Sequence, residues 1–467
     1  MTARTLLVGC LMMLAGSLHA QTPAAPAGQT GETPLPNKVL GRAPLQKKFG
    51  ANAELTYILQ SVTPFHSPYF GTNSLRSRRE TEASRSYTLY LWAHPSPRFE
   101  VYVNPELALG HGIGDGDGLA AYSNGDLIGQ PNFRPQPYLA RVFIRYRVPL
   151  QSGGSARPKQ AVKPGNEEIG GSLPASRLVF IASKFAISDH IDINTYANNA
   201  RNQFLNNAFV NNLAYDKAGD PRGYTHGIII SVLRPGLAVR IGSVALPAVS
   251  GGRDVSYNLR NQHAEQLETE IRPKVLAGQK AMPLILRLLT YRNEGTMGSY
   301  RDALQAAPGM TPDVTTVRRR AAFKYGFGLN FEQGISDGGA SGVFGRFGWN
   351  DGQTETFSYA EADRVMSFGG QVSGAHWKRA SDVLGVALAQ SDLSSAHKEY
   401  LAAGGLGPTL GDGALSYGSE RVAEVYYSYQ LTSNVSLSPD YQYISNPGFN
   451  HDRGPVSLIS LRLHLTF

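Results

Sequence analysis

The chain has 467 residues, with 44 lysines and arginines against 36 aspartates and glutamates, which gives a formal net charge of +8 at pH 7. Its single cysteine, Cys10, falls in a predicted leader peptide, so disulfides and thiol chemistry are excluded from the mature protein. The positive charge does not indicate a nucleic-acid partner, because the cations are scattered and the chain is expected to be exported.

The first twenty residues (1–20) have the pattern of a secretory signal peptide. One arginine precedes an apolar run that ends near Ala15, and a small residue, Ala20, stands at the expected cleavage point. The LVGC that ends at Cys10 is also similar to a lipoprotein signal, but lipidation there would leave an apolar run of only about five residues. We therefore expect cleavage after Ala20.

Residues 21–50 are rich in alanine, proline, glycine and threonine and are expected to form a flexible periplasmic segment. No stretch after this segment approaches the roughly eighteen consecutive apolar residues that a membrane-spanning helix needs. The 51 glycines and 23 tyrosines instead favour many strands and turns. We expect residues 51–467 to form one domain built of strands.

Apolar and polar side chains alternate along this domain. The pattern occurs in FEVYVNPELAL (99–109), ARVFIRYRV (140–148), AAFKYGFGLNFE (321–332), VAEVYYSYQL (422–431) and ISLRLHLTF (459–467). Such alternation gives each strand one apolar face and one polar face. A transmembrane β-barrel turns the apolar face to lipid and the polar face to a watery interior. The interior tolerates the Glu, Arg, Lys and Asn of these polar faces, so we predict an antiparallel transmembrane barrel.

We predict about sixteen strands, with eighteen as the alternative. The predicted strands are 51–62, 86–93, 98–110, 138–148, 177–185, 223–233, 237–246, 262–272, 282–292, 320–333, 340–350, 363–374, 381–391, 420–431, 435–445 and 456–467. An even number leaves both ends in the periplasm. The last strand must then pair with the first, because lipid cannot satisfy an open sheet edge.

The predicted connectors mostly alternate between short and long. Tight turns fall at 94–97, 234–236 and 432–434, and long loops at 63–85, 111–137, 186–222, 293–319 and 392–419. Short periplasmic turns and longer extracellular loops are typical of outer-membrane barrels. The segment 149–176 falls on a periplasmic position yet is long, so it departs from the alternation, and the sequence assigns it no role.

Four stretches carry a family resemblance. They are DYQYISNPGFNHDRGPVSLISLRLHLTF (440–467), YLAAGGLGPTLGDG (400–413), GRFGWNDG (345–352) and SKFAISDHIDINTYANNARNQFLNNA (183–208). These stretches resemble the carbohydrate-selective porin family, the OprB-type sugar porins of Gram-negative outer membranes. The resemblance implies a sixteen-stranded barrel in the cell outer membrane. It also implies that sugars pass by diffusion through a constriction lined by charged side chains.

A sugar pore needs donors and acceptors aimed at vicinal hydroxyls, and arginine suits this because its guanidinium presents several fixed donors. Inward positions of the predicted strands supply the pore-lining candidates Glu106, Arg141, Arg145, Arg287, Lys324, Arg346, Glu424, Asp440 and Arg462. The alternative for each of these residues is a salt-bridge lattice that stiffens the barrel wall.

The long segment 186–222 is rich in asparagine and aromatic residues, and a loop of this length is usually functional or disordered. Resemblance to porins implies that it folds into the barrel and contributes Asp192, Asn198 and Arg201 to a constriction. The alternative is an external loop that shields the mouth. The sequence does not decide between these two arrangements.

Other motifs give no support for catalysis or metal binding. GHGIGDGDG (110–118) lacks the twelfth-position glutamate of an EF-hand and is expected to be a glycine-rich loop, with calcium on Asp115 and Asp117 left open. GISDG (334–338) matches a nucleophile-elbow pattern but lies between two strands, so it is expected to be a hairpin turn. We therefore expect no catalytic residue, no metal and no cofactor.

The expected function is passive diffusion of monosaccharides or small oligosaccharides. The alternatives are a general or anion-preferring channel, an export portal and, as a third class, an enzyme built on a barrel. Expected partners are the permeating sugar, outer-membrane lipid and lipopolysaccharide near Arg318, Arg319 and Arg320, and the barrel assembly machinery, which would read Phe467 as its signal. No nucleic acid is expected, and the chain is expected to be a monomer or a homotrimer.

Overall fold

A computed structural model describes most of the predicted domain. The described residues are 48–127, 135–150, 158–252, 254–277, 280–357 and 361–467. The predicted signal peptide and nearly all of the segment 21–50 lie outside the described residues.

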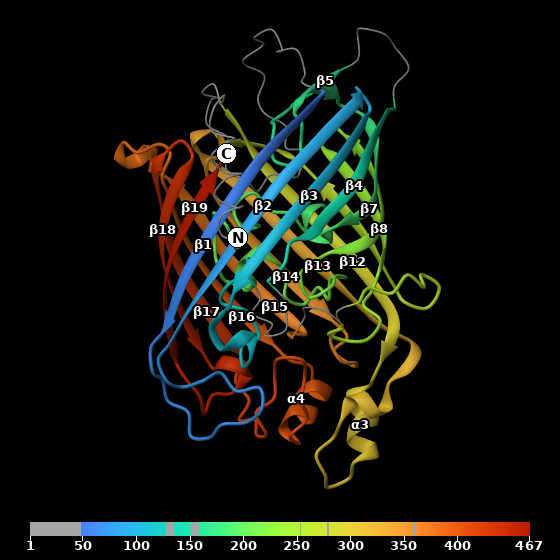
Figure 1. Ribbon diagram of the computed structural model, residues 1–467, viewed down its shortest axis with the longest axis vertical. Coiled ribbons are helices and arrows are strands. Elements are labelled where there is room, and N and C mark those ends of the chain that lie inside the picture. Colours follow the sequence, from blue (N-terminus) through green and yellow to red (C-terminus); the bar gives the residue numbers. More distant parts are fainter. Residues whose placement is uncertain (1–47, 128–134, 151–157, 253, 278–279, 358–360) are drawn as a thin grey trace, which may run out of the picture.

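Within the described residues, one sheet contains seventeen strands, sixteen of which form the wall of a closed barrel (Figure 1). The wall strands are β1 (Phe49–Val62), β2 (Glu80–Ser96), β3 (Phe99–Gly110), β4 (Tyr138–Pro149), β7 (Arg177–Phe185), β8 (Thr225–Arg234), β9 (Leu237–Ala245), β10 (His263–Ile271), β12 (Lys280–Met297), β13 (Arg319–Ser336), β14 (Ser341–Asn350), β15 (Arg364–Ser373), β16 (Val383–Asp392), β17 (Glu420–Thr432), β18 (Val435–Ser445) and β19 (Val456–Thr466). The seventeenth strand, β11 (Lys274–Ala277), pairs with the start of β12. The prediction of sixteen wall strands is confirmed.

The barrel closes between its first and last strands. β1 pairs with β2 on one side and with β19 on the other, both antiparallel, and Leu55 lies opposite Leu465 in the β1–β19 register. Beyond that register, Ala53 and Phe467 exchange two backbone hydrogen bonds of 3.0 and 2.8 Å. Closure leaves none of the sixteen described wall strands with a free edge, which is the condition for placing a sheet in lipid.

The two faces of the wall differ as the alternation predicts. On β19, Ile459 is 60% exposed on the outer face, whereas Arg462 is fully buried on the inner face. The same contrast separates Val425 from Glu424 on β17. The wall is therefore apolar outside and polar inside, the reverse of a soluble protein.

Two boundaries differ from prediction because polar residues hide the alternation. β2 begins at Glu80 rather than at residue 86, and its first residues pair with the end of β1, where Thr81 lies opposite Ser61. These positions carry Ser, Thr and Glu, so no apolar face marks them in the sequence. Similarly, β12 continues to Met297 through a run of polar residues.

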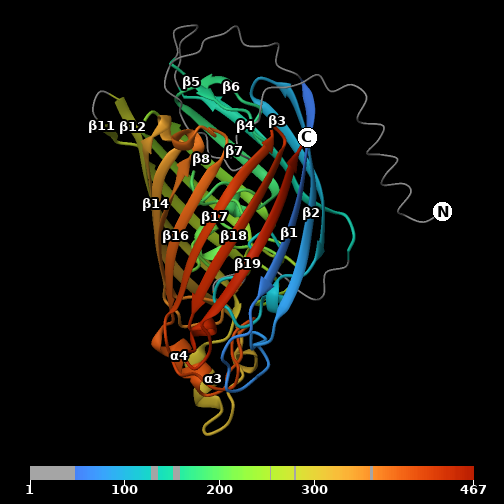
Figure 2. The ribbon, with the colours of Figure 1, turned by 90° about the vertical axis from the view of Figure 1, so that its left-hand side faces the viewer.

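The two ends of the barrel are unequal (Figure 2). One end carries the short turns, and the other carries long segments that contain α3 (Tyr300–Ala306) and α4 (Ser395–Ala402). A serine precedes each helix, Ser299 or Ser394, and its side chain accepts a hydrogen bond from a backbone amide of the first turn. Further short elements in the connections are α2 (Asn207–Val210), η1 (Ile113–Gly116), η2 (Ile187–Asp189), η3 (Val314–Val317), η4 (Asp337–Gly339), η5 (Gly374–Trp377) and η6 (Pro447–Phe449).

Among the helices of the described residues, none is long and apolar enough to cross a membrane.

The segment 149–176, to which the sequence assigned no role, contains a separate hairpin at the short-turn end. It consists of β5 (Lys159–Val162) and β6 (Gly171–Pro174), which pair with each other in a sheet of their own. Figure 2 shows this hairpin at the end of the barrel opposite α3 and α4.

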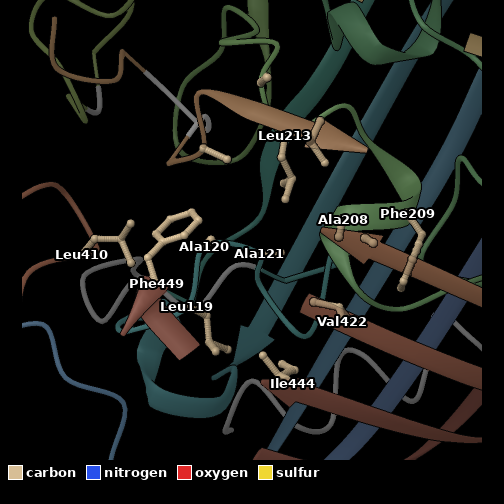
Figure 3. Packing of buried hydrophobic residues seen from close by; sticks show 14 of the residues in the cluster. Leu119, Ala120, Ala121, Ala208, Phe209, Leu213, Leu410, Val422, Ile444 and Phe449 are labelled. Carbon is tan, nitrogen blue, oxygen red and sulfur yellow. The ribbon is translucent and has the colours of Figure 1, made fainter. Parts of the chain in front are cut away.

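An apolar core lies inside the barrel (Figure 3). Its labelled side chains come from the β3–β4, β7–β8, β16–β17 and β18–β19 connections and from the wall strands β17 and β18. They are Leu119, Ala120, Ala121, Ala208, Phe209, Leu213, Leu410, Val422, Ile444 and Phe449. Burying this apolar surface favours inward folding of the connections, because every square ångström removed from water stabilises the folded chain.

Candidate permeation site

The segment 186–222, between β7 and β8, folds into the interior of the barrel. Phe204, Leu205 and Asn206 near its middle are fully buried, and its polar groups bond to strands on several sides of the wall. Of the two arrangements that the sequence left open, the structure shows the inward one. We call residues 186–222 the inner loop.

Wall carboxylates accept hydrogen bonds from backbone amides of the inner loop. Glu268 on β10 accepts from the amide of Asp192 at 2.7 Å, and Glu332 on β13 accepts from that of Thr195. A buried carboxylate without donors would cost several kcal/mol, and these charge-assisted bonds supply the donors. The backbone amides of the loop and the carboxylates of the wall thereby provide each other's hydrogen-bond partners.

Glu424 holds the middle of the inner loop in the same way. Its two oxygens accept from the adjacent amides of Leu205 and Asn206. The Asn206 side chain then donates to Gln442 on β18 at 2.9 Å. One carboxylate thus fixes the turn that begins α2.

Arginines of the wall bind the inner loop through its oxygens. Arg346 on β14 donates to the Asp192 carboxylate at 3.0 Å. Arg462 on β19 donates to the carbonyls of Ala200 at 2.7 Å and Gln203 at 2.6 Å. Both guanidinium groups are buried beneath the loop.

Lys324 and Arg287 are also enclosed. The Lys324 ammonium lies 3.5 Å from Asp216 of the inner loop. Arg287 bridges two wall carboxylates, Glu270 at 2.9 Å and Glu332 at 3.0 Å. These contacts match the salt-bridge lattice that was the alternative for each candidate.

Glycines on the wall allow the inner loop to approach the sheet closely. A Cβ on Gly342 would lie 2.3 Å from the ring of Tyr196, and one on Gly348 would lie 2.0 Å from the amide oxygen of Asn212. Both distances are far shorter than a van der Waals contact. Larger residues at these two wall positions would therefore displace the loop.

A second cluster, around Arg201 of the inner loop, is partly open to solvent. Its guanidinium donates to Asp126 at 2.7 Å, to Thr88 at 2.7 Å and to Glu106 at 2.9 Å, and lies 3.4 Å from Glu54. The Arg201 side chain retains 13% exposure. Its partners come from β1, β2, β3 and the β3–β4 connection, so this one residue joins several parts of the barrel.

Arg141 on β4 forms the third cluster. It binds Asp189 of the inner loop through two nitrogens, at 2.6 and 3.0 Å, and lies 3.1 Å from Glu167. Its guanidinium stacks 5.2 Å from the ring of Tyr224, whose hydroxyl donates to Glu106. Glu106 therefore contacts both the Arg141 and the Arg201 clusters.

The two carboxylates beside Arg141 differ in acidity. Burial alone would raise the pKa of Asp189, but the two short bonds from Arg141 hold it below its usual value. Burial raises the pKa of Glu167 to about 7, against the opposing effect of Arg141. Asp189 is accordingly the principal partner of Arg141.

The twelve predicted site residues fall into groups. Arg141 and Arg201 keep partial exposure, and Glu106 links their clusters. Asn198, also partly exposed, bonds within the inner loop to Asn194 and Gln203. The residues buried in contact with the loop, or in the wall beside it, are Asp192, Arg287, Lys324, Arg346, Glu424, Asp440 and Arg462. Arg145 lies apart, beside Glu100 and Glu168.

Sequence reasoning missed Glu54, Asp126, Glu167 and Glu168. Glu54 occupies an inward position of β1, opposite Thr466 in the register with β19. The alternation along β1 could therefore have identified it. The other three lie in connections, where no period marks an inward direction.

The motifs set aside in the sequence remain without a reactive arrangement. Asp115 is 3.3 Å from Arg76 and 2.8 Å from His111. In GISDG, one nitrogen of His376 faces both Ser336 and Asp337, so no relay from acid through histidine to serine can form. In the described part of the chain, no group of three or more His, Cys, Asp or Glu is arranged to hold a metal.

Comparisons with known proteins give a matching family and solved structures of similar fold. Residues 169–467 match the model of the carbohydrate-selective porin, OprB family. The high-pH structure of Pseudomonas putida OprB superposes with a TM-score of 0.66 at 15% identity, covering 90% of this chain and 94% of that one. The outer-membrane channel DcaP of Acinetobacter baumannii gives 0.47 at 10% identity, covering 90% and 97%. No curated protein matches the chain.

The anchoring of the inner loop can be tested at Glu424. Glu424→Ala removes the acceptor of two buried backbone amides, and hydrogen bonds to charged groups contribute about 1.5–3 kcal/mol each. We expect the loop to loosen, which should raise open-channel noise in planar bilayers and make the loop sensitive to protease. The control is Glu265→Ala, on the exposed outer face of β10. Quiet, protease-resistant channels from the Glu424 variant would show that the loop does not depend on this anchor.

Proposed function

Because the chain belongs to the carbohydrate-selective porin family, OprB, it is an outer-membrane channel for the diffusion of sugars, and we propose that sugars pass beside Arg141 and Arg201. The family and the fold indicate a channel rather than an enzyme. The proposal concerns which side chains the sugar meets inside the barrel.

The observation that carries the proposal is the residual side-chain exposure of two interior arginines. Arg141 and Arg201 retain 14% and 13% side-chain exposure, while Arg346 and Arg462 are fully buried. A solute in the lumen can therefore reach the first pair and not the second. We assign Arg141 and Arg201 to the constriction and the buried arginines to the support of the inner loop.

The chemistry of this pair suits a neutral sugar. Carboxylates hold each guanidinium in a fixed orientation, which lowers the ordering cost of a contact with a sugar hydroxyl. The partly exposed Tyr138 lies beside the pair and offers aromatic surface to the apolar face of a pyranose, whereas Tyr224 is buried against Arg141. The carboxylates balance the positive charge, so a neutral solute need not compete with a strongly bound anion.

Passage needs no energy source, because weak contacts that form and break along the lumen allow a solute to move down its gradient. A general, anion-preferring channel is the alternative, and it is favoured by the net charge of +8. The two differ in whether sugars block the ion current.

Lipid and lipopolysaccharide are proposed to surround the barrel. The outer face is apolar along the wall strands, which suits the hydrocarbon layer. At the end with the long connections, Arg319 and Arg320 are exposed, while Arg318 is paired with Glu355 at 2.7 Å. We propose that Arg319 and Arg320 face lipopolysaccharide phosphates.

Sugar passage can be measured as block of single-channel current in planar bilayers. We expect small sugars to interrupt the current of the unaltered protein, and Arg141→Ala to weaken that block and shift ion selectivity away from anions, because an exposed cation is lost. Arg145→Ala is the matched variant, since Arg145 is only 3% exposed and contacts Glu100 and Glu168.

We expect Arg145→Ala to lower the heat resistance of the barrel more than it alters sugar block. Equal effects of the two substitutions on block would contradict the assignment of the constriction. Current without any sugar block would favour the general channel.

Phe467 is proposed as the residue that the barrel assembly machinery reads. Its side chain is 58% exposed at the end of β19, next to the seam with β1. Deleting it should lower the amount of barrel inserted in the outer membrane, while the conductance of inserted channels stays unchanged. Phe467→Tyr keeps an aromatic end and should restore insertion. Normal insertion of the deletion variant would remove Phe467 from this role.

A further inference from the structure

The β5–β6 hairpin sends its tip into the lumen from the short-turn end of the barrel. The tip is residues 163–170, between Val162 and Gly171, which face each other in the hairpin. Gly165 and Glu168 exchange backbone hydrogen bonds of 2.7 and 3.3 Å, which makes the tip a tight turn. Its two glutamates, Glu167 and Glu168, are 2% and 3% exposed.

The tip is fixed to the wall at several points. Asn166 donates to Glu54 on β1, and Asn104 on β3 donates to Glu167. Ile169 packs against an apolar cluster of the wall that includes Tyr102 and Phe143. These contacts place the tip inside the barrel and in contact with β1, β3 and β4, so it is not a free periplasmic turn.

The base of the hairpin is held separately. Arg177, the first residue of β7, is 1% exposed and donates to the carbonyl of Pro174 at 2.6 Å and to Gln160 at 3.3 Å. At the tip, Gly170 has φ +73°, and a Cβ there would lie 2.6 Å from the nitrogen of Pro164. The hairpin therefore has a defined shape that does not depend on the tip's ion pairs alone.

The tip supplies negative charge to a row of arginines on β4. Glu168 lies 3.2 Å from Arg145 and 2.8 Å from Arg147, and Glu167 lies 3.1 Å from Arg141. The wall itself offers Arg145 and Arg147 the single carboxylate of Glu100. Two of the carboxylates that balance three arginines thus belong to the tip.

The tip and the inner loop share binding partners. Arg141 contacts Glu167 of the tip and Asp189 of the inner loop. Glu54 accepts from Asn166 of the tip and lies 3.4 Å from Arg201 of the loop. The two inserted segments therefore meet at the proposed constriction, one from each end of the barrel.

We propose that the tip, residues 163–170, is a second constriction, on the periplasmic side of Arg141 and Arg201, that limits the size of the permeating sugar and sets the charge of the exit. This inference rests on the proposed sugar pathway past Arg141 and Arg201. It assigns the partly exposed Asn166 as the residue of the tip that a sugar meets after the Arg141–Arg201 pair. The buried Glu167 and Glu168 set the charge at the exit through their contacts with the arginines of β4.

Removing the tip tests whether it limits the size of the sugar that passes through the channel. Replacing residues 163–170 by Asn-Gly joins Val162 to Gly171 across a two-residue turn and keeps the base of the hairpin. Single-channel conductance should rise by up to roughly twofold, since one of two constrictions in series is removed and the Arg141–Arg201 constriction remains. Liposome-swelling rates should extend to longer oligosaccharides, and the reversal potential should shift toward anions, because Arg145 and Arg147 lose Glu168.

The charge can be tested without changing the size of the tip. Glu167→Gln with Glu168→Gln should shift the reversal potential toward anions while the size limit for sugars changes little. Glu265→Gln, on the outer face, removes a carboxylate away from the lumen and should leave both properties unchanged.

A third measurement does not require deletion of the tip. Cys10 lies in the predicted leader, so Asn166→Cys would give the mature barrel a single thiol. A charged thiol reagent added on the periplasmic side should reduce the current stepwise, and it should leave the unaltered protein unaffected.

The possible failures can be told apart. If the tip-replaced channel keeps the original conductance, size limit and selectivity, or if modified Asn166→Cys conducts normally, the second constriction is wrong even though the pore works. An unaltered protein that shows no current and no sugar block would instead refute the proposed function.

Discussion

Buried carboxylates on the wall hold the interior of this barrel in place. Glu268, Glu332 and Glu424 accept hydrogen bonds from backbone amides of the inner loop. Glu420 accepts hydrogen bonds from the amides of Ala120 and Ala121 in the β3–β4 connection. Glu268 and Glu332 also pair with Arg240 and Arg287 on the wall, so the backbone amides of the loop complete a set of donors that the wall supplies only in part. Buried ion pairs add little net stability on average, so their value here is that they select one arrangement of the connections.

Because side chains alternate along each strand, the same wall presents an apolar face to lipid and a polar face to the inserted segments. Outward residues need only be apolar, whereas inward residues must match particular partners on the inserted segments. The apolar core around Phe209 and Val422 then fills the space that the ion pairs leave. The sugar pathway that we propose follows the inward groups that these segments leave partly exposed, among them Arg141 and Arg201.

The wall could be predicted from the sequence because alternation is a local signal that each strand carries by itself. The alternation did not reveal the start of β2, where Glu80 and Thr81 give no apolar face. The direction of the inner loop could not be predicted, since it depends on wall partners far along the chain, such as Arg462 for Ala200. The arginine row on β4 did contain a signal for the tip, because three inward cations require carboxylates that the neighbouring strands do not supply in equal number.

The position of the loop's partners has a consequence for the order in which the molecule matures. Leu205 and Asn206 bond to Glu424 and Gln442 across 219 and 236 residues of chain, and Ala200 bonds to Arg462 across 262. These partners lie on the last three strands of the wall, so the loop cannot acquire them before those strands are in place. Contacts between such distant residues also form slowly. A barrel whose last strands are not yet in place would consequently lack an anchored inner loop and would not select among solutes. Discrimination among solutes would be the last property that the molecule acquires.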